Sequence, residues 1–297
     1  MSMPLGSGSD IRPSVIVISS HVVRGSVGNR AAVFALEALG FPVWAVPTVL
    51  LPWHPGHSRA TRIVPPSDAF AALMNDLASS PWLGEVGAVL SGYLGDPDQA
   101  EHVARLVAAV RSANPSALYL CDPVSGDSGG LYVPEPVAAS IRDRLIPIAD
   151  IATPNVHELG WLSGAAINDV KSMIAAAETL GPARVLVTSA IAMMAGSTGN
   201  LLVSGGATRM AEHRLIDNPP NGPGDLMSAT FLARILEGLS EEKALQMATG
   251  SVFEILARTA RRGADELTLE TDAQSLRTPM ALVHMRRVMG GPLMPRD

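Results

Sequence analysis

Short continuous runs of apolar residues alternate along the chain with longer stretches in which apolar residues recur every three or four positions. The short runs are typical of strands that are buried on both faces of a parallel sheet. The longer stretches predict amphipathic helices. The predicted strands cover residues 15–18, 43–46, 86–90, 117–120, 150–152 and 184–187. The predicted helices cover residues 31–39, 67–77, 99–111, 136–145, 170–180 and 241–258, with a further helix starting at Asp225.

This alternation predicts an α/β protein with a mostly parallel central sheet between two layers of helices. Shorter apolar runs at residues 191–195, 201–203 and 208–213, separated by glycines, predict antiparallel strands at one edge of that sheet. The pattern contains no linker and no internal repeat, so we expect a single domain over residues 11–297. The glycine- and serine-rich residues 1–10 are expected to be a flexible leader.

The chain turns from a loop into a helix at residues 217–238. Prolines and glycines exclude regular structure up to Gly224, and apolar residues at helical spacing follow Asp225. The first amides of a helix have no intrahelical acceptors, so Gly222 and Gly224 could wrap a phosphate there. A carboxylate at that position can accept a proton from a substrate hydroxyl. The alternative is an ordinary turn in which Asp225 caps the helix.

Polar residues stand where the predicted parallel strands end. Ligands of such sheets bind beyond the carboxyl ends of the strands, so these residues should line one edge. They are Ser20, Thr48, Tyr93, Asp122, Asn155 and Thr188.

Three of the acidic and amide side chains fit a magnesium–nucleotide site. Asn155 and Glu158 are three residues apart and should share one face of a helical turn. Hydrated Mg²⁺ prefers such oxygen ligands and bridges phosphates, which makes Asp122 and Glu158 the candidate metal ligands. The alternatives are a solvated helix carboxylate for Glu158 and a turn residue for Asp122. Together with Asp225, these residues predict a Mg²⁺-dependent phosphotransferase.

Composition narrows the range of partners. The 297 residues are 47% hydrophobic and 17% charged, and the net charge of −6 is spread without basic clusters. This distribution argues against nucleic acid or an anionic membrane as the partner. The uncharged runs at residues 38–58 and 185–208 are interrupted by prolines, glycines and hydroxyl residues, so neither predicts a membrane span. Cys121 is the only cysteine, which excludes an intrachain disulfide and fits a cytoplasmic protein.

Several stretches of the sequence resemble the pyridoxal kinases of the ribokinase-like superfamily. The matching stretches run in order from about residue 11 to residue 258. The first of them is the most specific, because the sugar kinases of the superfamily lack it. They are SHVVRGSVGNRAA (20–32), SGYLG (91–95), CDPVSGD (121–127), LYVP (131–134), ADIATPN (149–155) with Glu158, and GPGD (222–225).

The resemblance implies a ribokinase-like fold and ATP-dependent phosphorylation of the 5′-hydroxymethyl group of pyridoxal, with pyridoxine and pyridoxamine as related substrates. It also implies a homodimer, Mg²⁺, and a glycine-rich flap at residues 126–130 that covers ATP, and it leaves a monovalent cation open. Asp225 would be the base, beside Gly222 and Gly224. The other implied contacts are Ser20, Thr48 and Tyr93 for the pyridine ring, Asp122, Asn155 and Glu158 for Mg²⁺ and phosphate, and Thr153, Thr188 and Ser189 for the nucleotide.

Three positions depart from the family pattern. Leu51 replaces an aromatic residue near the ring pocket, Pro223 removes an amide from the phosphate-binding turn, and His157 stands where acidic residues are common. We expect His157 to be a surface residue. Two rival functions remain on these grounds: a hydroxymethylpyrimidine-type kinase of the same fold, and a catalytically silent vitamer-binding protein.

Overall fold

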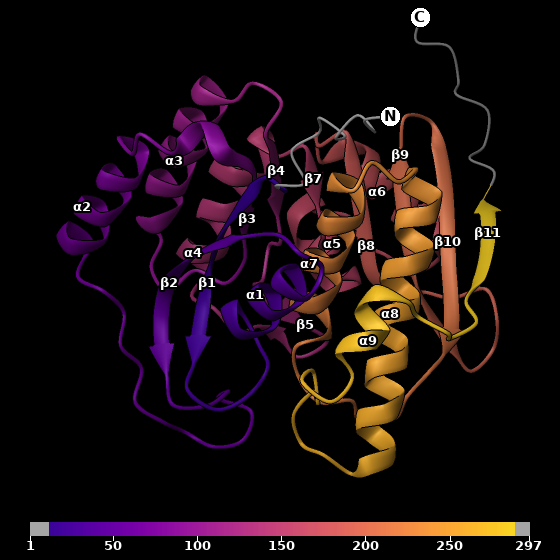
Figure 1. The fold of residues 1–297 in the computed structure, drawn as a ribbon. Coiled ribbons are helices and arrows are strands. Elements are labelled where there is room, and N and C mark those ends of the chain that lie inside the picture. Colours follow the sequence, from indigo (N-terminus) through magenta and orange to yellow (C-terminus); the bar gives the residue numbers. More distant parts are fainter. Residues whose placement is uncertain (1–11, 289–297) are drawn as a thin grey trace, which may run out of the picture.

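A nine-stranded sheet forms the middle layer of the computed structural model, which describes residues 12–288 (Figure 1). Six neighbouring strands are parallel, and three antiparallel strands extend one edge. The predicted leader at residues 1–10 lies outside the described residues. In spatial order the strands are β2 (Val43–Leu51), β1 (Ser14–Val22), β3 (Val86–Ser91), β4 (Leu118–Cys121), β7 (Ile151–Ala152), β8 (Arg184–Ala190), β9 (Ser197–Ser204), β10 (Ala207–Arg214) and β11 (His284–Val288).

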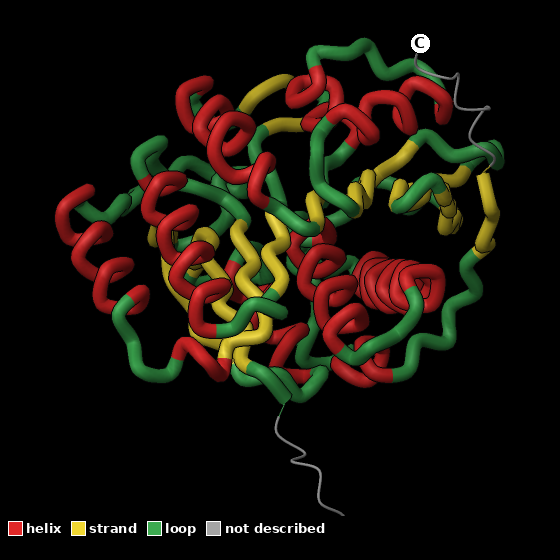
Figure 2. The backbone as a smooth tube through the Cα atoms, turned by 90° about the horizontal axis from the view of Figure 1, so that it is seen from above, coloured by secondary structure: helices red, strands yellow, loops and turns green. Residues whose placement is uncertain are grey.

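Helices cover both faces of this sheet, as Figure 2 shows. Side chains alternate between the faces of a strand, so Val15 and Val17 pack with one helical layer while Ile16 and Ile18 pack with the other. The predicted three-layer α/β/α architecture is therefore confirmed. The first layer holds α1 (Asn29–Ala38), α7 (Pro223–Leu236), α8 (Glu241–Arg262) and α9 (Ala273–Arg277). The second holds α2 (Ser67–Ala78), α3 (Gln99–Ala113), α4 (Glu135–Ser140), α5 (Val156–Ser163) and α6 (Val170–Thr179).

The prediction of a strand at residues 191–195 is wrong. These residues form bends and turns, and β9 begins only at Ser197. The amides of Met193 and Met194 donate to the buried carboxylate of Glu212, over 2.5 and 3.2 Å, instead of to a neighbouring strand. The other two antiparallel strands were predicted, and they form β9 and β10.

Several local elements differ from the sequence-based expectation. The predicted flap is a hairpin of two short strands, β5 (Gly126–Asp127) and β6 (Gly130–Leu131). The helix predicted at residues 136–145 is α4 followed by one π-helical turn at residues 141–145. Helices α5 and α9 and strand β11 were not predicted. Within residues 12–288, no helix is both long enough and apolar enough to cross a membrane.

The parallel strands end at a common level. Ile18 pairs with Ser91, Ser91 with Cys121, and Cys121 with Ala152. The residues that follow these strands are therefore neighbours in space, at the edge toward which the arrowheads of β1 and β2 point in Figure 1. This edge also receives the start of α7 and forms the candidate site.

Candidate active site

The phosphate-binding turn predicted at residues 222–225 is the start of α7. The helix begins at Pro223 and not at Asp225, with Gly222 as its N-cap in the left-handed conformation (φ 99°). A Cβ atom on Gly222 would collide with the carbonyl oxygen of Ser26, so only glycine fits there. Pro223 occupies the first helical position, where its fixed φ suits the helix and an amide would have no intrahelical partner.

The most specific sequence block, residues 20–32, lies against this helix start. Gly28 packs so closely on Ser20 that a Cβ atom would collide with both oxygens of Ser20. The Gly28 amide lies close enough to the Asp225 carboxylate to lower its pKa. Asn29 fixes the loop, because its Nδ2 atom donates to the carbonyls of Ser19 and Val46, each over 3.1 Å. The structure therefore brings Ser20 and Asp225 together.

Asp225 is the residue best placed to act as a base at this mouth. Burial raises its pKa to about 6, although hydrogen bonds from the amides of Gly28 and of Asp225 itself lower it in part. A carboxyl group with this pKa is mostly ionised at neutral pH and accepts a proton more readily than an ordinary aspartate does.

Asp122 lies at the end of β4 and contacts α7 through a hydroxyl relay. The Ser228 hydroxyl donates to Asp122 Oδ2 over 2.9 Å, and the Ser228 and Thr153 hydroxyls are 2.8 Å apart. Asp122 is 6% exposed. Burial and the negative charges of Glu158 and Asp225 hold its pKa well above the usual value.

Asn155 and Glu158 form a capping box at the start of α5. Asn155 Oδ1 accepts from the amides of His157 and Glu158, and Glu158 Oε2 accepts from the Asn155 amide over 2.8 Å. Glu158 Oε1 also accepts from the amide of Ser125, over 2.9 Å, at the base of the flap. Glu158 is 4% exposed, so it is not a solvated surface carboxylate. The pair ties the flap to α5.

The three acidic residues leave the site with excess negative charge. Burial raises the pKa of Glu158 to about 7, and the charge of Asp225 adds to this effect. A cation of the kind that carboxylates bind would neutralise the cluster. Within residues 12–288, no group of three or more His, Cys, Asp or Glu side chains could hold a metal ion by itself. Because both Glu158 oxygens already accept amides, Asp122 Oδ1 is the carboxylate oxygen freest to approach a cation.

Thr188 and Ser189 follow the regular part of β8 at a bulge. The Thr188 amide donates to the Pro154 carbonyl over 2.9 Å, and Thr188 forms an isolated bridge with Asn155. Ser189 is exposed and has a φ of 49°, which is unusual for a residue with a side chain. Both residues therefore lie beside Asn155. His157 is exposed, as expected, and borders a pocket of about 370 Å³ between the flap and α5.

The Thr48 hydroxyl is used in a hydrogen bond within the protein. Thr48 is fully buried, and its hydroxyl donates to the Tyr93 carbonyl over 2.7 Å. The Tyr93 amide donates to Ser19 Oγ over 3.1 Å, so Tyr93 is held from two strands. Leu51 packs with Val22, Val27 and Val49 in a small apolar cluster that Tyr93 also touches. Thr48 thus positions Tyr93, while Leu51 helps to form the apolar wall.

Ser228 and Gly28 were not named by the sequence analysis. Ser228 could have been found, because it lies three residues after Asp225 and so shares its face of α7. Gly28 lies within the quoted block, but no pattern in the sequence places its amide on a carboxylate almost two hundred residues away.

The comparisons with known proteins agree with this arrangement. The family model described as phosphomethylpyrimidine kinase matches residues 36–269. The pyridoxal kinase PdxY of Rubrobacter xylanophilus is 39% identical over 283 residues, which cover 93% of this chain and 97% of that protein. The PdxY of Granulibacter bethesdensis is 38% identical over 276 residues, 90% of this chain and 96% of that protein.

Solved structures give the same result. Pyridoxal kinase from Leishmania donovani in complex with ADP and pyridoxamine superposes with a TM-score of 0.87 at 29% identity, covering 93% of this chain and 99% of that one. Its complex with ADP and pyridoxine gives a TM-score of 0.86 at 30% identity, with the same coverage. The chain therefore belongs to the pyridoxal kinases, within the ribokinase-like group that the phosphomethylpyrimidine kinase model describes.

Proposed function

We propose that this protein uses ATP to phosphorylate the 5′-hydroxymethyl group of pyridoxal, and also phosphorylates pyridoxine and pyridoxamine. One observation carries the proposal: Gly222, at the start of α7, packs so closely on Ser26, in the block specific to these kinases, that a Cβ atom would collide with the Ser26 carbonyl oxygen. The loop expected to bind the alcohol and the turn expected to bind phosphate thus meet beside Asp225. The relatives named pyridoxal kinase, and those solved with ADP and a vitamer, support the same activity.

Asp225 would accept the proton of the substrate hydroxyl as the phosphoryl group is transferred. Such transfer passes through a loose transition state that depends mainly on alignment and on neutralisation of charge. The amides of Gly222, Gly224 and Asp225 would supply part of that neutralisation at the positive end of α7. A Cβ atom on Gly224 would meet nothing within 4 Å, so the turn has room for a phosphoryl group.

Mg²⁺ fits the acidic residues of this site. Asp122 and Glu158 would hold it, and the ion would supply charge neutralisation to the phosphates when bound. Ser228 would keep Asp122 in place through its 2.9 Å hydrogen bond. Dependence on a monovalent cation is tested by measuring initial rates with and without one.

The nucleotide would lie along the ends of β7 and β8. Thr153, Asn155, Thr188 and Ser189 are neighbours there and offer hydroxyl, amide and backbone groups. The flap would exclude water, because Glu158 and Asn155 hold its base through Ser125 and the Gly126 carbonyl. On the acceptor side, Ser20 would bond the pyridine ring while Tyr93 and Leu51 enclose it.

The rival functions are a kinase for hydroxymethylpyrimidine and a silent vitamer-binding protein. The matching family model is described as phosphomethylpyrimidine kinase, which is the reason to test hydroxymethylpyrimidine as a substrate. One assay separates all three: the purified protein is incubated with Mg-ATP, and ADP formation is measured with pyridoxal, pyridoxine, pyridoxamine, hydroxymethylpyrimidine and ribose. The proposal expects ADP with the three vitamers. Binding of a vitamer without ADP formation would refute the enzyme, and turnover of hydroxymethylpyrimidine alone would support that rival.

Two broader expectations belong to the same proposal. A homodimer is expected from the resemblance, and sedimentation equilibrium would test it. A cytoplasmic location is supported by the single cysteine, Cys121, which is buried and has no disulfide partner in this sequence.

A further inference from the structure

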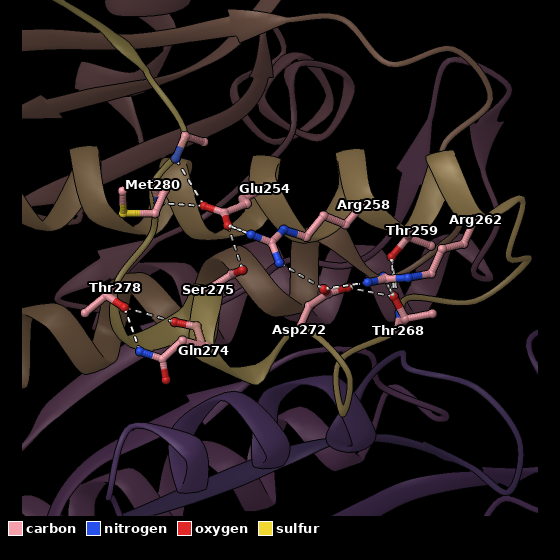
Figure 3. A network of polar contacts seen from close by, with 11 residues as sticks. Glu254, Arg258, Thr259, Arg262, Thr268, Asp272, Gln274, Ser275, Thr278 and Met280 are labelled. Atoms are coloured by element: carbon pink, nitrogen blue, oxygen red, sulfur yellow. Dashed lines mark hydrogen bonds and ion pairs between the residues drawn. The ribbon is translucent and has the colours of Figure 1, made fainter.

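The segment after α8, residues 264–281, is fixed to that helix by buried ionic contacts (Figure 3). Asp272 Oδ2 and Oδ1 accept from the two guanidinium nitrogens of Arg262, over 2.5 and 3.0 Å. Glu254 Oε2 accepts from the amides of Met280 and Ala281, over 2.6 and 3.1 Å. Because both carboxylates are buried and fully bonded, this segment is a firm base for the residues that project from it.

Glu266 projects from this segment toward two loops at once. Its Oε1 atom lies 2.7 Å from His57 Nε2, and its Oε2 atom accepts from the Ser26 amide over 3.2 Å. The side chain is only 13% exposed. The loop approaches it so closely that a Cβ atom on Gly25 would lie 2.5 Å from Oε1, and Gly25 has a φ of 112°. Glycine alone permits this approach.

The first of the two loops, residues 52–66, has contacts at two places near the candidate site. At one end, Arg62 donates to the Gly95 carbonyl over 2.9 Å and to the Tyr93 hydroxyl over 3.3 Å. At the other, Gly56 lies beside Asn221, the residue before the phosphate-binding turn. The loop therefore runs from the predicted ring pocket to the turn at Gly222.

The second loop, residues 24–29, connects Glu266 to the turn at residues 222–225. Ser26 donates from its hydroxyl to the Leu267 carbonyl over 3.0 Å, and its own carbonyl packs against Gly222. Two residues later, Gly28 lies beside the Asp225 carboxylate. Glu266 therefore contacts both loops, and one of them leads to the start of α7.

We propose that Glu266 is a positioning residue that latches the 52–66 loop, through His57, to the loop at residues 24–29, and so retains the acceptor substrate. The inference rests on the proposed function for the identity of that substrate. It assigns Glu266 and His57 no contact with the nucleotide.

The test compares Glu266→Ala and His57→Ala with Glu270→Ala. Glu270 is a matched control, because it is an exposed acidic residue of the same 264–281 segment, whereas Asp265 pairs with Arg24, which itself lies 3.6 Å from Glu266. His57→Ala breaks only the loop side of the latch, so it decides the question even if Glu266→Ala fails to fold. One readout is the KM for pyridoxal and for ATP. The other is limited proteolysis of the substrate-free protein by trypsin, which can cut at the exposed Arg59 and Arg62.

Both latch variants should raise the KM for pyridoxal about tenfold, with a smaller change in kcat and an unchanged KM for ATP. Trypsin should cut the 52–66 loop about tenfold faster in them than in the wild type, whereas Glu270→Ala should behave like the wild type in both measurements. Unchanged proteolysis in both latch variants, or equal effects in Glu270→Ala, would overturn the inference. If the wild type does not phosphorylate pyridoxal, the proposed function fails, but the trypsin comparison still decides the role of Glu266.

Discussion

The Ser228 hydroxyl donates a 2.9 Å hydrogen bond to Oδ2 of Asp122, and this bond joins the helix of the phosphate-binding turn to the strand end that carries the proposed metal ligand. Ser228 lies one turn after Asp225, so α7 presents both residues to the same site. The relationship gives Ser228 a role in orienting Asp122.

We expect Ser228→Ala to raise the KM for Mg-ATP about tenfold, because Asp122 loses a donor to its charged form and is harder to ionise. Initial rates measured at varied concentrations of Mg-ATP give this KM. Thr230→Val is the matched control, since Thr230 is also buried in α7 but its hydroxyl donates to the Leu226 carbonyl. If the two substitutions changed the KM for Mg-ATP equally, Ser228 would act only through packing.

Pro223→Thr gives the turn an additional amide donor and should change turnover less than about tenfold. A missing oxyanion-hole donor lowers the rate strongly only when the remaining donors cannot replace it. Pro223 stands at the first helical position, which suits proline, and the amides of Gly222, Gly224 and Asp225 remain. Steady-state kcat with pyridoxal and Mg-ATP is the measurement. A gain much larger than tenfold would mean that the turn lacks an essential donor.

Asp225→Asn should keep nucleotide binding and lose most turnover, on the order of a hundredfold or more, because asparagine cannot accept the hydroxyl proton. Calorimetric titration with Mg-ADP provides the binding control. A variant with wild-type turnover would remove Asp225 from the role of base.

The kcat/KM for pyridoxal should increase with pH through about 6 and then level off. Burial raises the pKa of Asp225 to about 6, and only its ionised form can act as a base. Initial rates measured from about pH 5 to about pH 8 test this expectation. A profile that is flat across that range would contradict the assignment.

The stabilisation of the protein by Mg-ADP should be larger at about pH 8 than at about pH 6. Burial raises the folded-state pKa of Glu158 to about 7, above its unfolded value, so protonation stabilises the ligand-free protein at low pH. That contribution is lost as the pH rises through about 7, whereas a cation prefers the ionised carboxylates that then prevail. Thermal unfolding with Mg-ADP, and with ADP and a chelator as the control, measures the difference. An equal shift at both pH values would contradict it.

Much of the fold was predictable because hydrophobic periodicity reports burial directly. The six parallel strands are apolar runs, and the polar residues after them had to meet because parallel strands end at one edge. Asp122 and Asn155 were picked out in this way, whereas Asp225 was picked out because a proline- and glycine-rich loop turns into a helix there. The run at residues 191–195 misled because it is apolar, while the group that fixes it, Glu212, lies on another strand.

The remaining parts of the site depend on side-chain direction and on long-range contacts. Its place at a strand end and the family resemblance marked Thr48 as a ring ligand, whereas in the structure its hydroxyl donates to the Tyr93 carbonyl. Glu158 was expected near metal, and the Asn155–Glu158 spacing also matches a capping box, which the structure contains. The contact of Glu266 with His57 joins residues 209 positions apart, and no local pattern encodes it.

The most direct test of the account is the identity of the product formed from pyridoxal and Mg-ATP. Mass spectrometry and ³¹P NMR of the reaction mixture would identify and quantify the phosphorylated vitamer beside ADP. We predict equimolar pyridoxal 5′-phosphate and ADP with the wild type, and about a hundredth of either or less with Asp225→Asn in the same time. ADP without the phosphorylated vitamer, or no product while pyridoxal binds, would contradict the central claim that Asp225 and the start of α7 form a pyridoxal kinase site.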